Sequence, residues 1–171
     1  MARFSRVQVW STMEQIGMVP LFYNGDVETS VQIAGALAAG GARVIEFTNR
    51  GDRAFEVFRE MVVRLEKDHP QVILGVGSVL DPATAGLYIN LGANFIVGSV
   101  TNPEVAKLCN RRKIAYFPGC ATASEVSAAE ELGCEIVKVF PGSELGGPSF
   151  VKAITAPCPW SKIMPTGGVE A

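Results

Sequence analysis

One lysine within an apolar run has the residue type and setting for covalent chemistry. Lys138 lies in Cys134-Glu135-Ile136-Val137-Lys138-Val139-Phe140-Pro141, where β-branched residues predict a buried strand. Since side chains alternate along a strand, Ile136, Lys138 and Phe140 share one face. Burial of the ammonium there would lower its pKa, and a neutral amine can attack a carbonyl to form an imine. The alternative is a lysine at a strand end whose ammonium reaches water.

A carboxylate and a guanidinium share the face of another predicted strand. In Val44-Ile45-Glu46-Phe47-Thr48-Asn49-Arg50, alternation places Glu46 and Arg50 on one side. A carboxylate midway along a buried strand needs an oppositely charged partner or a functional role. Glu46 is therefore a candidate general acid/base beside an imine. The alternative is a structural ion pair with Lys138 or Arg50. Arg50 can clamp a substrate carboxylate, or it can be a surface arginine near Asp52.

The elements that must position these side chains alternate regularly along the chain. Short apolar runs predict strands at 19–23, 44–49, 72–79, 95–99, 115–119, 136–140 and 163–165. Amphipathic runs predict helices at 7–16, 27–39, 53–67, 82–91, 103–112, 123–132 and 149–154. Strands that are apolar on both faces and separated by single helices indicate a parallel α/β sheet. The repeat of about 20 to 30 residues favours a (β/α) barrel, the TIM-barrel class, over a doubly wound sheet, because no G-x-G-x-x-G follows the first strand.

Local signals support these boundaries. Asp81, Asn102 and Thr122 are expected to cap the starts of helices, and glycines past helix ends (Gly40-Gly41, Gly92 and Gly133) are expected in left-handed conformation. We expect one barrel domain over residues 1–171, with seven strands present and an eighth strand and its helix missing. Such an open barrel exposes two sheet edges.

Composition narrows the possible functions. With 171 residues, a net charge of -2 and no basic stripe, the chain gives no indication of nucleic-acid binding. The four cysteines and His69 show no zinc-ligand spacing, so we expect no metal site; the cysteines are interpreted as reduced core thiols and His69 as a surface or capping residue. Without a signal-like N-terminus or an apolar run of about 20 residues, we expect a cytoplasmic protein that does not span a membrane.

Two glycine-rich segments close strands three and seven. Gly75-Val76-Gly77-Ser78 and Pro165-Thr166-Gly167-Gly168 are interpreted as turns whose backbone can approach an anion, or as plain turns. In barrels the loop after strand seven often joins a phosphate site.

Taken together, these segments resemble the 2-keto-3-deoxy-6-phosphogluconate / 4-hydroxy-2-oxoglutarate aldolase family over nearly the whole chain. The matching pieces are Val19-Pro20, Gly40-Gly41, Ile45-Glu46-Phe47-Thr48-Asn49-Arg50, Gly75-Val76-Gly77-Ser78-Val79-Leu80, Gly92-Ala93-Asn94-Phe95-Ile96-Val97, Phe117-Pro118-Gly119, Val137-Lys138-Val139-Phe140-Pro141, Gly146-Gly147 and Pro165-Thr166-Gly167-Gly168-Val169. The resemblance implies a trimeric (β/α)8 barrel, a class I aldolase that needs no metal or cofactor and takes a small keto acid.

The resemblance also implies a role for each site residue. Lys138 is expected to form the imine and Glu46 to shuttle protons. Arg50 and Ser78 are expected to bind the pyruvate carboxylate, while Phe140 packs beside the imine and Thr166 lines the pocket. Gly167 and Gly168 lie where the family holds a substrate phosphate.

Three departures from the family pattern bear on function. Ser78 replaces a threonine, Val97-Gly98-Ser99-Val100 replaces a Ser-Pro-Gly turn, and the eighth strand, which supplies a serine to the phosphate site, is not in these residues. The leading hypothesis is cleavage of a 2-keto-3-deoxy-6-phosphosugar acid or 4-hydroxy-2-oxoglutarate to pyruvate and an aldehyde. A non-catalytic or ligand-binding barrel remnant and another phosphate-binding barrel enzyme, such as an isomerase, are the alternatives.

Overall fold

The structure is a computed structural model that describes residues 2–168. Its helices are α1 (Arg6–Ile16), α2 (Val27–Ala39), α3 (Ala54–Asp68), α4 (Pro82–Leu91), α5 (Pro103–Arg112), α6 (Ala123–Glu131) and α7 (Pro148–Thr155). Its strands are β1 (Leu21–Phe22), β2 (Val44–Thr48), β3 (Ile73–Gly77), β4 (Phe95–Val97), β5 (Ala115–Phe117), β6 (Gly119–Cys120), β7 (Val137–Val139) and β8 (Ile163–Pro165). No helix in the described range is long and apolar enough to cross a membrane.

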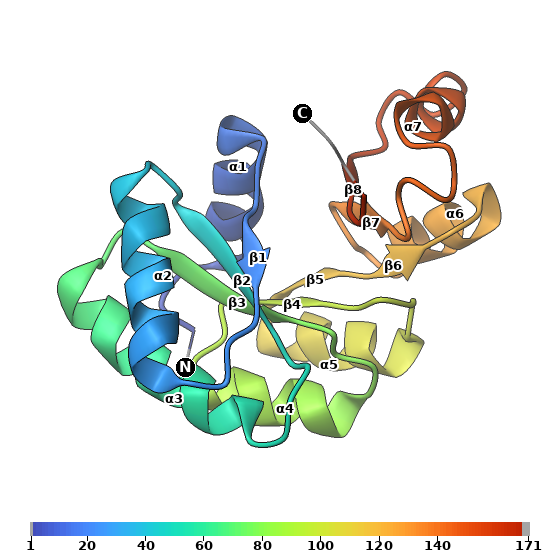
Figure 1. The fold of residues 1–171 in the computed structure, drawn as a ribbon. Helices are drawn as coiled ribbons and strands as arrows, with labels where there is room; N and C mark the ends of the chain where they lie inside the picture. Colours follow the sequence, from blue (N-terminus) through green and yellow to red (C-terminus); the bar gives the residue numbers. More distant parts are fainter. Residues whose placement is uncertain (1, 169–171) are drawn as a thin grey trace.

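All strand pairs are parallel, as the sequence predicts. Strands β1 to β5 pair in sequence order, and β6, β7 and β8 form a second group in the same order. Helices α2 to α5 cover the outer face of the first group, and α6 and α7 lie beside the second (Figure 1). Between β8 and β1 the described residues form no ladder, which agrees with the open barrel predicted from the sequence.

The fifth predicted strand is divided in the structure. Seven strands are predicted from the sequence, and the seven segments are all present, but residues 115–120 form both β5 and β6, with Pro118 between them. Proline has no N–H to donate to a ladder. The backbone therefore pairs on one side before Pro118 and on the other side from Pro118 onward. The Phe117 carbonyl accepts from the Gly98 N–H, after β4, and the Pro118 carbonyl accepts from the Lys138 N–H, in β7. This short segment therefore joins the two groups of strands.

Apolar packing separates an inner core from an outer one. Val44, Ile73 and Phe95 of β2, β3 and β4 pack inside the barrel with residues of α1 and with Ile136, which directly precedes β7. Alternate strand residues, such as Ile45 and Val76, pack outward against α2 to α5. The alternation predicted for the second and sixth predicted strands is confirmed, because Ile136 faces inward whereas Val137 packs outward with α6 and α7.

Local helix signals are confirmed at the predicted positions. The side chains of Asp81, Asn102 and Thr122 accept hydrogen bonds from backbone N–H groups in the first turns of α4, α5 and α6. Gly41, Gly92 and Gly133 have positive φ, as expected. Gly40, in contrast, has a φ of −75° and ends α2 without the left-handed conformation predicted for it. His69 is the half-buried C-cap of α3.

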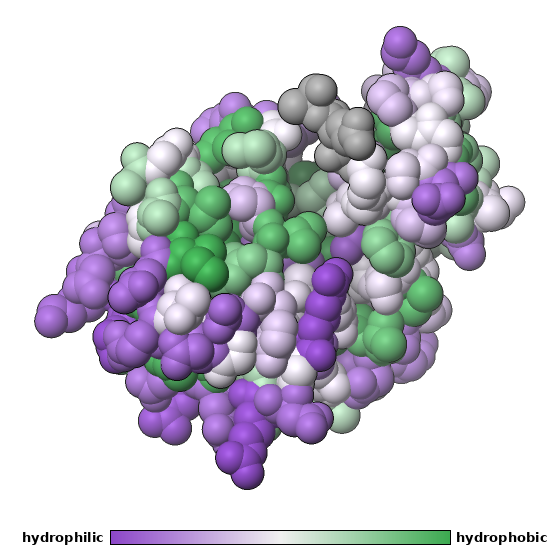
Figure 2. All heavy atoms as spheres, in the orientation of Figure 1, coloured by the Kyte–Doolittle hydropathy of each residue, from purple (hydrophilic) through white to green (hydrophobic). Residues whose placement is uncertain are grey.

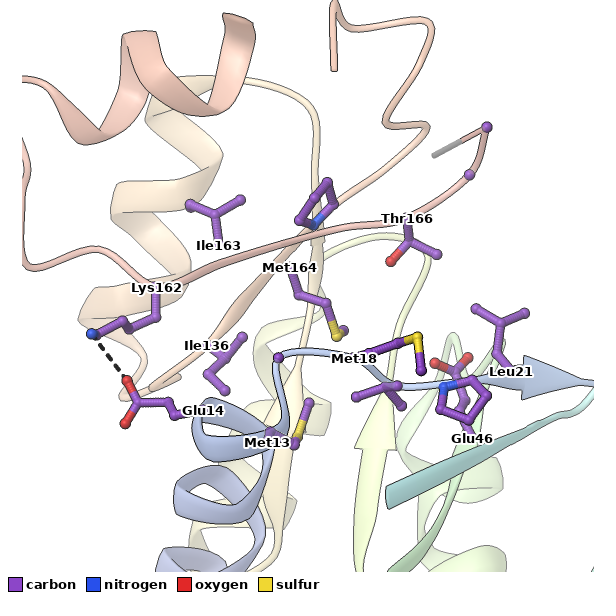
Figure 3. A pocket seen from close by; sticks show the side chains of 16 residues that line it. Met13, Glu14, Met18, Leu21, Glu46, Ile136, Lys162, Ile163, Met164 and Thr166 are labelled. Carbon is purple, nitrogen blue, oxygen red and sulfur yellow. Dashed lines mark ion pairs between the residues drawn. The ribbon is translucent and has the colours of Figure 1, made fainter. Parts of the chain in front are cut away.

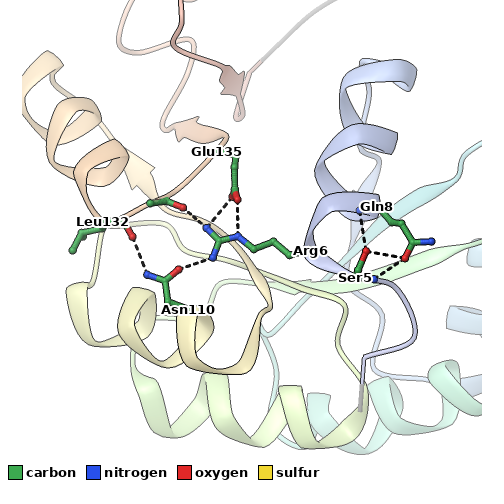
Figure 4. A network of polar contacts seen from close by, with 7 residues as sticks. Ser5, Arg6, Gln8, Asn110, Leu132 and Glu135 are labelled. Carbon is green, nitrogen blue, oxygen red and sulfur yellow. Dashed lines mark hydrogen bonds and ion pairs between the residues drawn. The ribbon is translucent and has the colours of Figure 1, made fainter.

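A polar network anchors α1 to the loops around the second group of strands (Figure 4). Arg6 contacts both carboxylate oxygens of Glu135, at 2.7 Å from Nε and 3.0 Å from Nη2. Its guanidinium also donates to Asn110 Oδ1 at 2.5 Å and to the Gly133 carbonyl. Asn110 in turn donates to the Leu132 carbonyl. One arginine thus joins the start of the chain to α5 and to the loop before β7.

Replacing Arg6 with alanine is expected to destabilise the fold by about 2 kcal/mol, because it leaves a partly buried carboxylate and a carbonyl without their charged donor. Chemical denaturation measures this. The matched control is Arg64→Ala, which breaks a contact of the same kind between exposed side chains of α3 and α2. Solvent screens that pair, so a much smaller change is expected. Equal changes for the two variants would contradict the role given to the network.

Candidate active site

Lys138 lies on β7 with its side chain inside the barrel. Only 6% of it is exposed. Burial lowers the pKa of its ammonium below the ordinary value, the Arg50 charge adds to this, and the Glu46 charge opposes it. The ammonium lies 5.1 Å from the centre of the Phe140 ring. The amine is therefore set in a largely dry environment that favours its neutral, nucleophilic form.

Glu46 lies on β2, also on the inward face, and is 2% exposed. Burial raises the pKa of its carboxyl above the ordinary value, while the charges of Lys138 and Arg50 act in the opposite direction. Among residues 2–168, no ion pair within 4.0 Å joins Glu46 to Lys138 or Arg50. The structural ion pair considered from the sequence is thus not formed, and the two groups influence each other through space.

Arg50 and Ser78 follow the carboxyl ends of β2 and β3. Arg50 is exposed, and its backbone N–H donates to the Thr48 carbonyl. Ser78 is half-buried and has a φ of 61°, in the left-handed region that few non-glycine residues adopt. Both residues therefore stand at the end of the barrel where active sites of this architecture lie.

Backbone hydrogen bonds join the segments after β7 and β8. The Thr166 N–H donates to the Val139 carbonyl, and the Gly142 N–H donates to the Thr166 carbonyl at 2.7 Å. Gly167 and Gly168 have φ values of 91° and 63°, and a side chain on Gly167 would approach the Phe140 ring. The predicted turn after β8 is confirmed up to Gly168, and it packs against the segment that follows Lys138. Val169 lies outside the described residues.

The other glycine-rich segment differs from its predicted form. Gly75 and Gly77 lie inside β3, as the predicted strand at 72–79 implies, and not in a turn; of these four residues only Ser78 has a positive φ. Both glycines are buried and sit where inward-facing side chains would otherwise stand. Their missing side chains make room for side chains from the strands on either side. The Phe95 ring covers the backbone of Gly75, and anion binding by the rest of this segment stays a prediction.

A groove of about 680 Å³ lies between β8 and β1 (Figure 3). Its walls are largely apolar and come from α1 and the segment after it on one side and from β8 on the other. Met13, Met18 and Met164 line it, and Glu46 and Thr166 stand at its edge. In the space-filling view the same region is a hollow flanked by hydrophobic residues (Figure 2). Lys138 does not line the groove, although its register partner Met164 does.

No group of three or more His, Cys, Asp or Glu side chains within residues 2–168 could hold a metal ion. All four cysteines are free, with Cys109, Cys120 and Cys134 buried. Burial raises the pKa of Cys109 and Cys134 to about 12, so these thiols are protonated packing residues rather than nucleophiles.

Two features of the site were missed from the sequence. Asn49 accepts a hydrogen bond from the Tyr88 hydroxyl at 2.8 Å, which fixes the end of β2 against α4. Gly77 lies directly beneath the Glu46 carboxylate. The alternation of glycines at 75 and 77 is a signal that could have been interpreted as two bare inward positions.

Comparisons with known proteins point to one family. The family model for KDPG and KHG aldolase matches residues 9–171 of this chain. The 2-dehydro-3-deoxy-phosphogluconate aldolase of Treponema pallidum is 32% identical over 96% of this chain and 76% of its own length. The enzyme of the same name from Pseudomonas aeruginosa is 36% identical over 81% of this chain, and the match spans 61% of its length.

A solved structure agrees with these matches. KDPG aldolase from Legionella pneumophila, with pyruvate captured as a covalent carbinolamine intermediate, superimposes with a TM-score of 0.80. The match is 29% identical and covers 88% of this chain and 71% of that one. The barrel fold predicted from the sequence is thus confirmed.

Proposed function

Because this chain belongs to the KDPG and KHG aldolase family, we propose that Lys138 is its imine-forming nucleophile. The activity is that of a class I aldolase, which cleaves a 4-hydroxy-2-keto acid to pyruvate and an aldehyde. The observation that carries the assignment to Lys138 is a buried, inward-facing amine with a lowered pKa, next to the charge of a buried Glu46. Lys138 also lies in the segment that matches the family pattern.

The reaction needs no external oxidant or reductant. The neutral amine of Lys138 adds to the C2 carbonyl, and loss of water from the carbinolamine gives a protonated imine. When the C3–C4 bond breaks, its electron pair moves to C3 and the imine accepts it as an enamine. The 4-hydroxyl loses its proton and becomes the aldehyde carbonyl. Protonation of the enamine at C3 and hydrolysis of the imine then release pyruvate and regenerate the amine.

Glu46 is proposed as the group that moves these protons. Burial raises the pKa of the carboxyl, which makes Glu46 a stronger proton acceptor than an exposed glutamate and suits it to general acid–base catalysis. Since Glu46 and Lys138 come from different strands, the barrel holds both groups at fixed positions around one substrate. A bridging water fits this role, because no described side chain pairs with the carboxylate.

The remaining site residues are proposed to bind the substrate. Arg50 and the hydroxyl of Ser78 stand at the ends of β2 and β3, where they can hold the pyruvate carboxylate. Phe140 packs beside the imine nitrogen, and Thr166 lines the pocket wall. The backbone at Gly167 and Gly168, in left-handed conformation, is proposed to approach a substrate phosphate.

Reductive trapping tests the assignment. Pyruvate and sodium borohydride are added to the folded protein, and the intact mass and the modified residue are determined. A reduced pyruvyl adduct on Lys138 is expected. An adduct on another residue would assign the imine elsewhere, and no adduct in a folded sample would favour the non-catalytic alternative. Turnover without any adduct would favour another class of barrel enzyme.

We also propose that the chain assembles as a homotrimer. Among residues 2–168, six large apolar side chains are more than half exposed: Val7, Met18, Val63, Leu80, Val100 and Trp160. The family resemblance implies a trimer, and these exposed apolar side chains are candidates for its subunit contacts. Light scattering is expected to give three times the 18.2 kDa of one chain, and the mass of a single chain would contradict the proposal.

The four cysteines, all of them free, support the proposal that the protein is active in the reducing cytoplasm.

A further inference from the structure

The inward face of β3 has no side chain beyond Ile73. Gly75 and Gly77 are the next two residues on that face, and both are buried. Neither has a positive φ, so their backbone conformation does not require glycine. The reason for glycine must therefore be the space that a Cβ atom would take.

Side chains from the neighbouring strands occupy that space. A Cβ atom on Gly77 would lie 1.7 Å from Oε1, 2.5 Å from Cδ and 3.0 Å from Cγ of Glu46. A Cβ atom on Gly75 would lie 2.4 Å from three atoms of the Phe95 ring. The Glu46 carboxylate thus rests against the bare backbone at Gly77, and the Phe95 ring rests against Gly75.

The backbone around Gly77 has little freedom to move away. Gly77 pairs in register with Thr48 on β2, and its carbonyl accepts from the Asn49 N–H at 2.8 Å. On the other side of β3, Val76 pairs with Ile96, and the Val79 N–H donates to the Val97 carbonyl. An added methyl group at position 77 would therefore displace the flexible end of Glu46 rather than the strand.

We infer that Gly77 is a positioning residue for the reaction: by lacking a side chain, it sets where the Glu46 carboxylate lies relative to Lys138. This inference rests on the proposed function of those two residues. It assigns Gly77 a task that differs from that of Gly75, whose missing side chain serves the packing of Phe95.

The two glycines give a matched pair of variants. Gly77→Ala is expected to fold with a denaturation midpoint close to that of the unmodified protein, because a flexible carboxylate yields. Its kcat is expected to fall about 10- to 100-fold, since a displacement of the order of 1 Å is enough for such a loss. Gly75→Ala meets a fully buried ring and is expected to lose stability strongly.

Shortening the carboxylate side chain tests the mechanism of the Gly77 effect. Glu46→Asp withdraws the carboxylate by one methylene and clears the space above residue 77. Gly77→Ala is therefore expected to cost less than about 2-fold in kcat when Glu46→Asp is present, compared with 10-fold or more when Glu46 is intact. An equal cost in both backgrounds, or an unchanged kcat for Gly77→Ala, would overturn the inference.

A second readout does not depend on turnover. The pH dependence of Lys138 acetylation by acetic anhydride, followed by peptide mass spectrometry, reports the protonation of the amine. Moving the Glu46 charge is expected to shift this pH midpoint in Gly77→Ala, whereas an unchanged midpoint would count against the inference. If the unmodified protein forms no pyruvate adduct but the midpoint still shifts, the proposed function fails while the placement of Glu46 by Gly77 stands.

Discussion

Replacing Lys138 with methionine is expected to abolish aldol cleavage, with kcat lowered by roughly 10⁴-fold or more. Methionine keeps an unbranched chain of similar length in the buried site but has no amine to form the imine. It also removes a buried charge, so the fold is expected to remain intact or to become more stable. Pyruvate release from a 4-hydroxy-2-keto acid, measured with a coupled assay, follows the activity, and denaturation follows the fold.

The control for this variant is Lys107→Met, which removes an exposed lysine of α5 that pairs with Glu104. Its kcat is expected to match that of the unmodified protein. Borohydride and pyruvate are expected to modify the control but not Lys138→Met. Retention of cleavage by Lys138→Met would exclude the imine mechanism at this residue.

Replacing Glu46 with glutamine is expected to lower kcat by about 10²- to 10⁴-fold, the range lost with a general acid–base. The amide keeps the shape of the side chain but cannot accept the proton of the 4-hydroxyl. A purely structural Glu46 would leave kcat close to normal at the optimum pH. The steady-state kinetics of cleavage therefore decide between the two roles.

The same variant has an expected pH signature. In the unmodified protein the Glu46 charge raises the pKa of Lys138, against the effect of burial. Removing that charge lowers the Lys138 pKa further, so the neutral amine persists to lower pH. The pH midpoint of borohydride trapping is thus expected to move toward acid in Glu46→Gln. Glu104→Gln, which changes an exposed carboxylate in the first turn of α5, serves as the control, and a shift toward alkali in Glu46→Gln would contradict the coupling.

Much of the fold follows from local sequence signals. The ends of α2, α4 and α5 coincide with their predicted ends, because side-chain caps such as Asp81 and Asn102 act within one turn. The division of the strand at Pro118 was not predicted. It depends on which strands lie on either side of residues 115–120, and that is a property of the whole sheet.

The candidate site, like the fold, was predicted only in part from local sequence signals. Alternation along a strand predicted that Lys138 and Glu46 face the barrel interior, since the period of two is a local rule. The sequence could not tell whether the two groups form an ion pair, and the structure places them close enough to influence each other's pKa without one. That outcome depends on distances across the barrel, between residues far apart in the chain.

By itself, the sequence determined the order of strands and helices, the caps that delimit several helices, and the inward faces of the strands that hold Lys138 and Glu46. Only the tertiary structure decided what those inward faces contact. The Arg6 network, the groove between β8 and β1 and the contact of Gly77 with Glu46 all join segments that no local pattern connects. Capping and alternation act over a few residues, whereas the space around a buried carboxylate is set by strands that meet only when the barrel has formed.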